Sequence, residues 1–329
     1  MFDPELTLAA EAQPRFDYSQ PTTARSRVAR MGATLVTKRY WKELESAVTY
    51  RDLTIPQDAD GPPIPIRIYT PNTAILSGGA VVFFHGGGFM VGDLNVEHYR
   101  CLKWAQETRT IIVSCDYRLS PENRFPAALE DCTGCFGWVA DNASDLGIDP
   151  SRIVVAGVSA GGNLAAAVSL FNRDHGLRPA CLQMLVYPAL DDRMTSRSMN
   201  THTDQPGWTR ADTKHMWAHY LGPLRDNVSP YAAPSRASDL SGLPPAYVLT
   251  AEFDPLRDEA TDYALRLTSA DVAVDFRNFA GTFHGFDVVK ESRLAQYAMN
   301  DQIFAINRVM EATAKPKPTL VSATANASL

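Results

Sequence analysis

The segment RIVVAGVSAGGNLAAAVSLF (residues 152–171) changes its pattern twice along its length. Residues 153–155 are β-branched, which favours a buried strand, and the last nine letters follow a helical pattern. Between them, Gly157 and Gly161 lack side chains where the strand and helix backbones would meet, so a Cβ at either position would clash. The segment therefore predicts a strand, a sharp turn with Ser159 at its apex, and a helix.

Similar apolar runs recur along the chain, separated by helical patterns. This alternation is typical of an α/β fold, in which a mostly parallel sheet is flanked by helices on both faces. The predicted strands span residues 64–69, 80–86, 110–117, 152–157, 181–188, 246–252 and 274–279, and the predicted helices span residues 122–141, 160–171, 256–269 and 291–312.

Two segments interrupt the alternation. Residues 1–45 precede the core, and residues 189–243 are much longer than one connection between neighbouring strands requires. The second segment is rich in large apolar side chains, so we expect the two to pack together as a helical cap. The core then consists of residues 46–188 and 244–312, and the polar tail, residues 313–329, is predicted to be disordered.

The composition excludes several classes of protein. The chain has 329 residues and a net charge of −6, which argues against binding to nucleic acid or to anionic membranes. No apolar stretch approaches the roughly 18 residues of a membrane-spanning helix, and the N-terminal sequence does not resemble a signal peptide. Five cysteines, an odd number, suit a reducing compartment. We therefore expect a cytoplasmic protein.

The glycine-rich turn around Ser159 permits two interpretations. A strand–turn–helix setting is where the G-x-S-x-G nucleophile elbow occurs, but a helix with an N-capping serine would show the same letters. The segment FFHGGGF (residues 83–89) favours the elbow, because consecutive glycines allow backbone N–H groups to form an oxyanion hole. Loops of this HGGG type accompany the elbow in lipases and esterases. A phosphate-binding loop is the alternative, but its usual glycine spacings are absent from the sequence.

A serine nucleophile also needs a base and an acid, which follow it in the chain order serine, acid, histidine in this fold. His284 is the only histidine beyond the last candidate acid, and glycines flank its predicted loop. Asp254 directly follows a predicted strand and is the preferred acid. Glu252, in the strand end, and Asp258, in the following helix, remain alternatives. Taken singly, His284 could be a hydrogen-bonded loop residue and Asp254 a helix cap.

Together these motifs resemble the hormone-sensitive-lipase-like family of bacterial carboxylesterases. The resemblance implies an α/β-hydrolase fold with a mostly parallel eight-stranded sheet and a helical cap. It also implies hydrolysis of small ester substrates without a metal or organic cofactor, and a homodimer formed through an edge strand near the C-terminus. The motifs are HGGGF (85–89), DYRLSPENRFPAALEDC (116–132), GVSAGG (157–162), YPALDD (187–192), DPLRDE (254–259) and FHGF (283–286).

The resemblance also implies the roles of individual residues. Ser159 would be the nucleophile, His284 the base and Asp254 the acid, while His85 would have a structural role in its loop. The expected oxyanion donors are the backbone N–H groups of Gly87, Gly88 and Ala160. The bulky apolar candidates for lining a site for short- to medium-chain acyl esters are Phe89, Met90, Trp208, Met216, Trp217 and Tyr220.

Val158 departs from the family pattern, in which an aspartate or a threonine usually precedes the nucleophile. Valine cannot form the hydrogen bonds of those residues, so a substrate preference does not carry over from a subfamily. The same triad could serve a lactone, amide or carbamate hydrolase. The plant gibberellin receptors resemble this family but lack the catalytic histidine, whereas His284 is present here.

Two pairs of residues could suggest a metal or redox site. Cys132 and Cys135 fall on the apolar stripe of the predicted helix 122–141, so we predict buried core thiols. His215 and His219 have the i, i+4 spacing of two metal ligands on one helix face. The sequence offers no HExxH glutamate and no evident third ligand, so we predict no metal at this pair.

Overall fold

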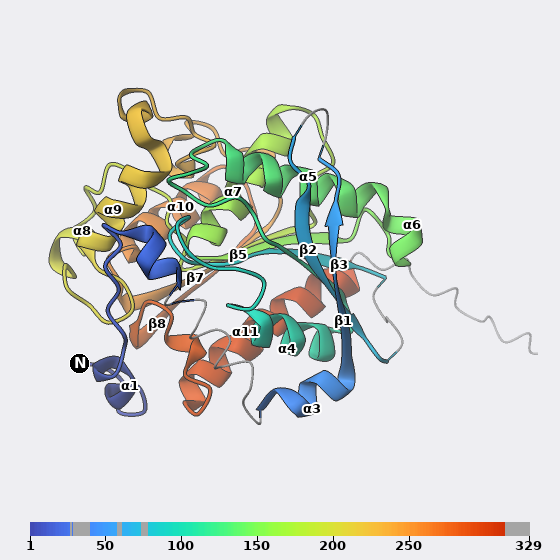
Figure 1. Cartoon of the computed structure of the whole chain (residues 1–329), viewed down its shortest axis with the longest axis horizontal. Helices are drawn as coiled ribbons and strands as arrows, with labels where there is room; N and C mark the ends of the chain where they lie inside the picture. The colour runs from blue at the N-terminus through green and yellow to red at the C-terminus, as the bar shows by residue number, and fades with distance from the viewer. Residues whose placement is uncertain (27, 29–39, 58–60, 74–77, 313–329) are drawn as a thin grey trace, which may run out of the picture.

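The computed structural model describes residues 1–26, 28, 40–57, 61–73 and 78–312. Its central feature is an eight-stranded sheet in the order β1-β2-β4-β3-β5-β6-β7-β8 (Figure 1). The strands from β4 to β8 in this order run parallel, and β2, near one edge, pairs antiparallel with both β4 and the edge strand β1. The predicted α/β architecture with a mostly parallel sheet is therefore confirmed.

Seven of the strands coincide with predicted apolar runs: β2 Ile64–Pro71, β3 Ala80–Phe84, β4 Ile111–Cys115, β5 Ile153–Val158, β6 Leu182–Val186, β7 Ala246–Phe253 and β8 Val274–Phe283. The apolar runs do not predict β1, Val48–Ile55. Most of its residues are exposed because it is an edge strand, so it lacks the continuous apolar pattern of the buried strands.

Helices cover both faces of the sheet (Figure 1). In β3, Ala80, Val82 and Phe84 pack on one face, and Val81 and Phe83 pack on the other. The alternation follows from the period of two residues in a strand. The first face carries α5 Ala127–Asp141, α7 Ala160–Asp174 and α10 Arg257–Ser269, with the short α6 Ala143–Leu146 after α5, and the second face carries α3 Tyr40–Ala47, α4 His98–Thr108 and α11 Arg293–Ala312.

The long segment 189–243 leaves the sheet between β6 and β7. The N-terminal arm, residues 1–26, lies against it: the rings of Tyr18 and Trp208 are 5.1 Å apart, and Arg15 pairs with Asp204. The expected tail at residues 313–329 and most of residues 27–39 lie outside the described residues. The segment contains α8 Arg197–Thr201, α9 Arg210–Leu221, η1 Gly222–Asp226 and η2 Pro234–Arg236, and the arm contains α1 Thr7–Glu11.

The structure can be compared with two predictions from the sequence, the buried thiols on the helix 122–141 and the lack of a membrane-spanning stretch. All five cysteines are free thiols, and Cys132 and Cys135 are fully buried on α5, as predicted. In the described part of the chain, no helix combines the length and the apolar character that crossing a bilayer requires.

A buried ion network lies on the face of the sheet covered by α4 and α11. Arg100, only 2% exposed, donates to Asp287 Oδ2 at 3.0 Å, to Glu97 Oε2 at 2.9 Å and to Gln302 Oε1 at 2.7 Å. Asp287 belongs to the short turn η3 Phe286–Val288, and its Oδ1 accepts a hydrogen bond from the Tyr187 hydroxyl at 2.7 Å. The network ties two helices to the loop that follows β8.

Replacing Arg100 should therefore be costly. In the variant Arg100→Met, two carboxylates stay close together in the interior without their cation, which typically costs about 3–5 kcal/mol. We expect the free energy of unfolding, measured by urea titration, to fall by that amount. The control is Lys103→Met on the same helix, which breaks a more exposed ion pair with Glu107 and should cost less than about 1 kcal/mol. Equal losses in the two variants would contradict the prediction.

Candidate active site

The turn between β5 and α7 holds Ser159 in a strained conformation. Its φ of 56° and ψ of −115° are rare for a residue with a side chain. The turn is also tight, because a Cβ on Gly157 would lie 2.0 Å from the Gly161 oxygen, and a Cβ on Gly161 would lie 2.0 Å from the Phe84 oxygen. The Ser159 N–H donates to the Val186 oxygen at 2.9 Å, which fixes the turn against the neighbouring strand.

Ser159, His284 and Asp254 form a continuous hydrogen-bonded chain. The Ser159 Oγ lies 3.0 Å from His284 Nε2, and His284 Nδ1 lies 2.6 Å from Asp254 Oδ2. Asp254 is fully buried, whereas His284 and Ser159 are 8% and 4% exposed. Because a carboxylate can only accept, Nδ1 carries the proton that it donates to Asp254, and Nε2 is then available to accept the serine proton.

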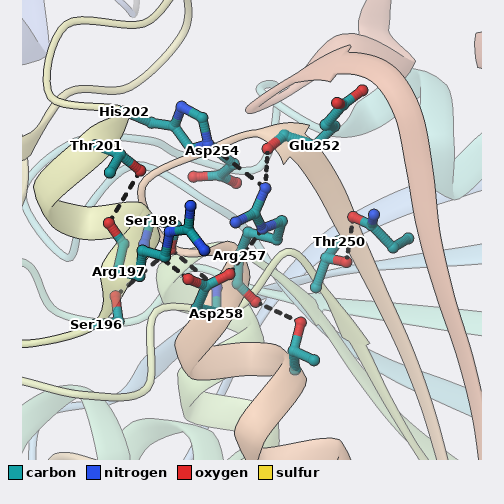
Figure 2. A network of polar contacts seen from close by, with 12 residues as sticks. Ser196, Arg197, Ser198, Thr201, His202, Thr250, Glu252, Asp254, Arg257 and Asp258 are labelled. Carbon is teal, nitrogen blue, oxygen red and sulfur yellow. Dashed lines mark hydrogen bonds and ion pairs between the residues drawn. The ribbon is translucent and has the colours of Figure 1, made fainter.

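The two alternative acids have other partners, and Figure 2 shows Asp258 beside Ser198. The Glu252 carboxylate accepts the Gly281 N–H at 2.7 Å, and Asp258 accepts the Ser198 N–H at 2.7 Å. Within the described residues, neither carboxylate bonds to His284. The geometry thus favours Asp254 as the acid.

The glycine loop after β3 lies directly beside the serine. A Cβ on Gly86 would be 3.6 Å from the Ser159 Cβ. Gly87 and Gly88 have φ values of 120° and 60°, which strongly favour glycine. Among the described residues, the backbone N–H groups of Gly87, Gly88 and Ala160 make no hydrogen bond. They are therefore free to bind an oxyanion next to the serine hydroxyl.

His85 supports this loop from inside the protein. Its ring stacks on Tyr117 at 4.3 Å, its Nδ1–H donates to the Gly86 oxygen at 2.7 Å, and the Tyr117 hydroxyl donates to the His85 oxygen at 2.7 Å. Complete burial lowers the pKa of His85 to about 4, so the ring is neutral at pH 7. These contacts agree with a structural role.

Val158 supports the same loop by packing. It is the last residue of β5 and is 4% exposed, and its Cγ1 would be 3.5 Å from a Cβ on Gly86. An apolar side chain therefore fills the contact between the strand end and the glycine loop.

The candidate lining residues divide into two groups. Trp208, Met216 and Met90 surround Gly88, because a Cβ there would lie 2.8 Å from Trp208 Cη2, 3.5 Å from Met216 Cγ and 3.2 Å from Met90 Cε. The Trp208 ring is also 5.9 Å from that of His284. The other three pack on one another, with Phe89 stacked on Tyr220 at 3.8 Å and 6.0 Å from Trp217.

The sequence patterns do not identify three residues near the site. Tyr187, with φ of 36°, places its ring 4.7 Å from His284. It directly follows β6, whereas the predicted strand 181–188 includes it, so the sequence does not mark it as a loop residue. Tyr18 packs on Trp208, and Ser198 contacts the loop of Asp254. These two contacts join distant parts of the chain, and no local pattern indicates them.

The histidine pair on α9 does not form part of this site. The rings of His215 and His219 stack with centroids 6.5 Å apart. Across the described ranges, no group of three or more histidine, cysteine, aspartate or glutamate residues is arranged to hold a metal ion.

Comparison with known proteins identifies the family. A model of the alpha/beta hydrolase fold matches residues 81–288, so the chain belongs to this family, and the resemblance to its hormone-sensitive-lipase-like members is confirmed. Carboxylesterase NlhH of Mycobacterium tuberculosis is 40% identical over 229 residues, which are 68% of this chain and 71% of the relative.

Two further comparisons agree with this assignment. Esterase LipI of the same organism is 41% identical over 236 residues, covering 69% of this chain and 72% of LipI. The solved structure of a bacterial heroin esterase superposes with a TM-score of 0.89 at 39% identity, covering 94% of this chain and 98% of that structure.

The buried His85 leads to a prediction about stability and pH. The pKa of His85 is about 4 in the folded protein, below the value of about 6.5 in an unfolded chain. Between these values the unfolded chain binds the proton more readily. The contribution of His85 to the free energy of unfolding is therefore complete above pH 6.5 and is lost as the pH falls toward 4.

Urea titrations at several pH values between about 7.5 and about 4.5 would test this prediction. They give the slope of the unfolding free energy against pH, which proton linkage relates to the difference in bound protons between the unfolded and folded states. The wild type should lose more stability on acidification than His85→Asn, and the comparison removes the contribution of the carboxylates common to both proteins. Identical pH dependences would contradict it.

Proposed function

We propose that this protein is a serine carboxylesterase that acts through an acyl-enzyme intermediate on Ser159. The hydrogen-bonded chain from Asp254 through His284 to Ser159, beside a glycine loop with free N–H groups, is the observation that carries the proposal. The names of the relatives, carboxylesterase and esterase, support the same class of reaction.

In the proposed mechanism, His284 Nε2 takes the proton of Ser159 as Oγ attacks the ester carbonyl carbon. Asp254 holds the imidazole in the correct tautomer and stabilises the imidazolium. The N–H groups of Gly87, Gly88 and Ala160 stabilise the oxyanion of the tetrahedral intermediate. His284 then protonates the departing alcohol, and water attacks the acyl-enzyme by the same route to release the acid.

The proposed substrates are esters with short to medium acyl chains. Trp208, Met216 and Met90 support this proposal, because they are buried apolar side chains gathered around Gly88 beside the nucleophile. Phe89, Trp217 and Tyr220 would stabilise this lining from behind. In the proposed mechanism, His284 alone accepts the proton of Ser159 and delivers it to the departing alcohol.

The proposal includes the organisation of the chain. We infer a cap made of residues 1–45 and 189–243, supported by the contacts of the N-terminal arm with the longer segment. A cytoplasmic location fits the free thiols, and a homodimer through β8 fits the place of that strand at the end of the sheet.

Replacing the nucleophile tests the proposed function. Ser159→Ala should lower kcat for p-nitrophenyl butyrate by at least about 10⁴-fold, because the remaining groups cannot form the acyl-enzyme. The melting temperature should stay close to that of the wild type. Ser269→Ala, which removes an exposed hydroxyl on α10, is the matched control and should keep full activity. A rate near that of the wild type in Ser159→Ala would refute the proposal.

Replacing Trp208 tests the proposed lining. Trp208→Ala opens space between Gly88 and His284, so it should raise kcat/KM for p-nitrophenyl octanoate relative to the butyrate by about 10-fold. Trp138→Ala, near the C-terminal end of α5, serves as the control and should leave this ratio unchanged. An unchanged ratio in Trp208→Ala would exclude this residue from the acyl site.

A further inference from the structure

Ser198, in the 189–243 segment, makes three hydrogen bonds to the loop that carries Asp254, and Figure 2 shows Ser198 beside Asp258. Its Oγ donates to the Pro255 oxygen at 2.8 Å and accepts the Asp258 N–H at 3.0 Å, and its own N–H donates to Asp258 Oδ2 at 2.7 Å. Ser198 is fully buried. All three bonds go to Pro255 and Asp258, which lie on either side of the point where α10 begins, shortly after Asp254.

These bonds replace a helix cap that the sequence of α10 lacks. The first N–H groups of a helix have no partner within the helix, and a side chain at the N-cap normally accepts from the second or third of them. The N-cap residue of α10 is Leu256, which has no polar side-chain atom and forms no such bond. Ser198 therefore caps α10 from another part of the chain by accepting the N–H of Asp258, the second residue of the helix.

Arg257 connects the two ends of the loop that carries Asp254. Its Nε donates to Asp258 Oδ1 at 2.7 Å, and its guanidinium donates to the Glu252 oxygen at 2.9 Å (Figure 2). Although burial acts to raise the pKa of Asp258, the hydrogen bonds from Arg257 and Ser198 hold it below its usual value, so the carboxylate stays charged. Residues 252–258 thus form a closed loop with Asp254 inside it.

The position of Asp254 follows from this closed loop. Its Oδ1 accepts the Leu256 N–H at 2.9 Å, which leaves Oδ2 to face His284 Nδ1 at 2.6 Å. We propose that Ser198 and Asp258 are positioning residues that hold Asp254 at this distance from His284. The inference rests on the proposed function and deepens it: the 189–243 segment takes part in aligning the triad as well as in covering the substrate.

The test is a double-mutant cycle with p-nitrophenyl butyrate. Ser198→Ala should lower kcat by about 10- to 100-fold with little change in KM, because a small displacement of a catalytic group is enough for such a loss. In the Asp254→Ala background, Ser198→Ala should not lower the residual rate further, because there is no carboxylate left to position. Thr201→Ala is the control on the same helix, since it removes a hydroxyl that, within the described ranges, bonds only to the Arg197 oxygen, and it should leave kcat unchanged.

Two kinetic results would overturn the inference. One is an equal fractional loss in the wild-type and Asp254→Ala backgrounds, which would indicate general damage to the fold. The other is an unchanged kcat in Ser198→Ala. If that variant does not fold, Asp258→Asn, which keeps the shape of the side chain, is measured by the same criteria. Failure of the inference would leave the loss of activity in Ser159→Ala intact. Full activity in Ser159→Ala would instead refute the proposed function.

The proton NMR spectrum of the folded protein gives a second readout. A proton shared between His284 Nδ1 and Asp254 Oδ2 at 2.6 Å should give a resonance far downfield. The resonance should shift or broaden in Ser198→Ala and stay unchanged in Thr201→Ala. An unchanged resonance in Ser198→Ala would also overturn the inference.

Discussion

The close approach of the α7 N-terminus to the end of β3 is the constraint on which the site depends. At Gly161 the two backbones are so near that no side chain fits between them, and the turn leaves Ser159 in a strained conformation. Neighbouring segments hold that strain. The Ser159 oxygen accepts the N–H groups of Asn163 at 3.1 Å and Ala189 at 3.3 Å, in addition to the bond from its own N–H to Val186. Strained residues persist where their surroundings fix them in this way.

The start of α10 extends these constraints to Asp254. Glu259, one residue after Asp258, accepts the N–H groups of Leu190 and Asp191 at 2.7 and 3.2 Å. Burial raises the pKa of Glu259 well above its ordinary value. The loop after β6 bonds to the Ser159 turn through Ala189, and it is thus also tied to α10, the helix that follows Asp254. The positions of Ser159 and Asp254 are consequently not independent.

The sequence patterns predict the buried parallel strands, because such strands are apolar on both faces, and they indicate Ser159, Asp254 and His284 by their positions after strands. They do not predict β1, whose exposed edge position removes the apolar pattern. The contacts of Tyr18 and Ser198 also cannot be predicted from the sequence patterns, because they depend on how segments distant in the chain pack together. The pattern prefers Asp254 to Glu252 and Asp258 by its position after a strand, but the partner of each carboxylate depends on side-chain directions, which no linear pattern contains.

The two partners of the shortest hydrogen bond in the site are anchored in different layers of the molecule. The loop of His284 is attached through Asp287 and Arg100 to the helices on one face of the sheet, whereas the loop of Asp254 is attached to α8 and α10, with α10 packed on the opposite face. A sliding motion of one helical layer relative to the other would therefore change the distance between His284 and Asp254. The catalytic rate would then respond to the packing of both layers, including residues that never touch the substrate.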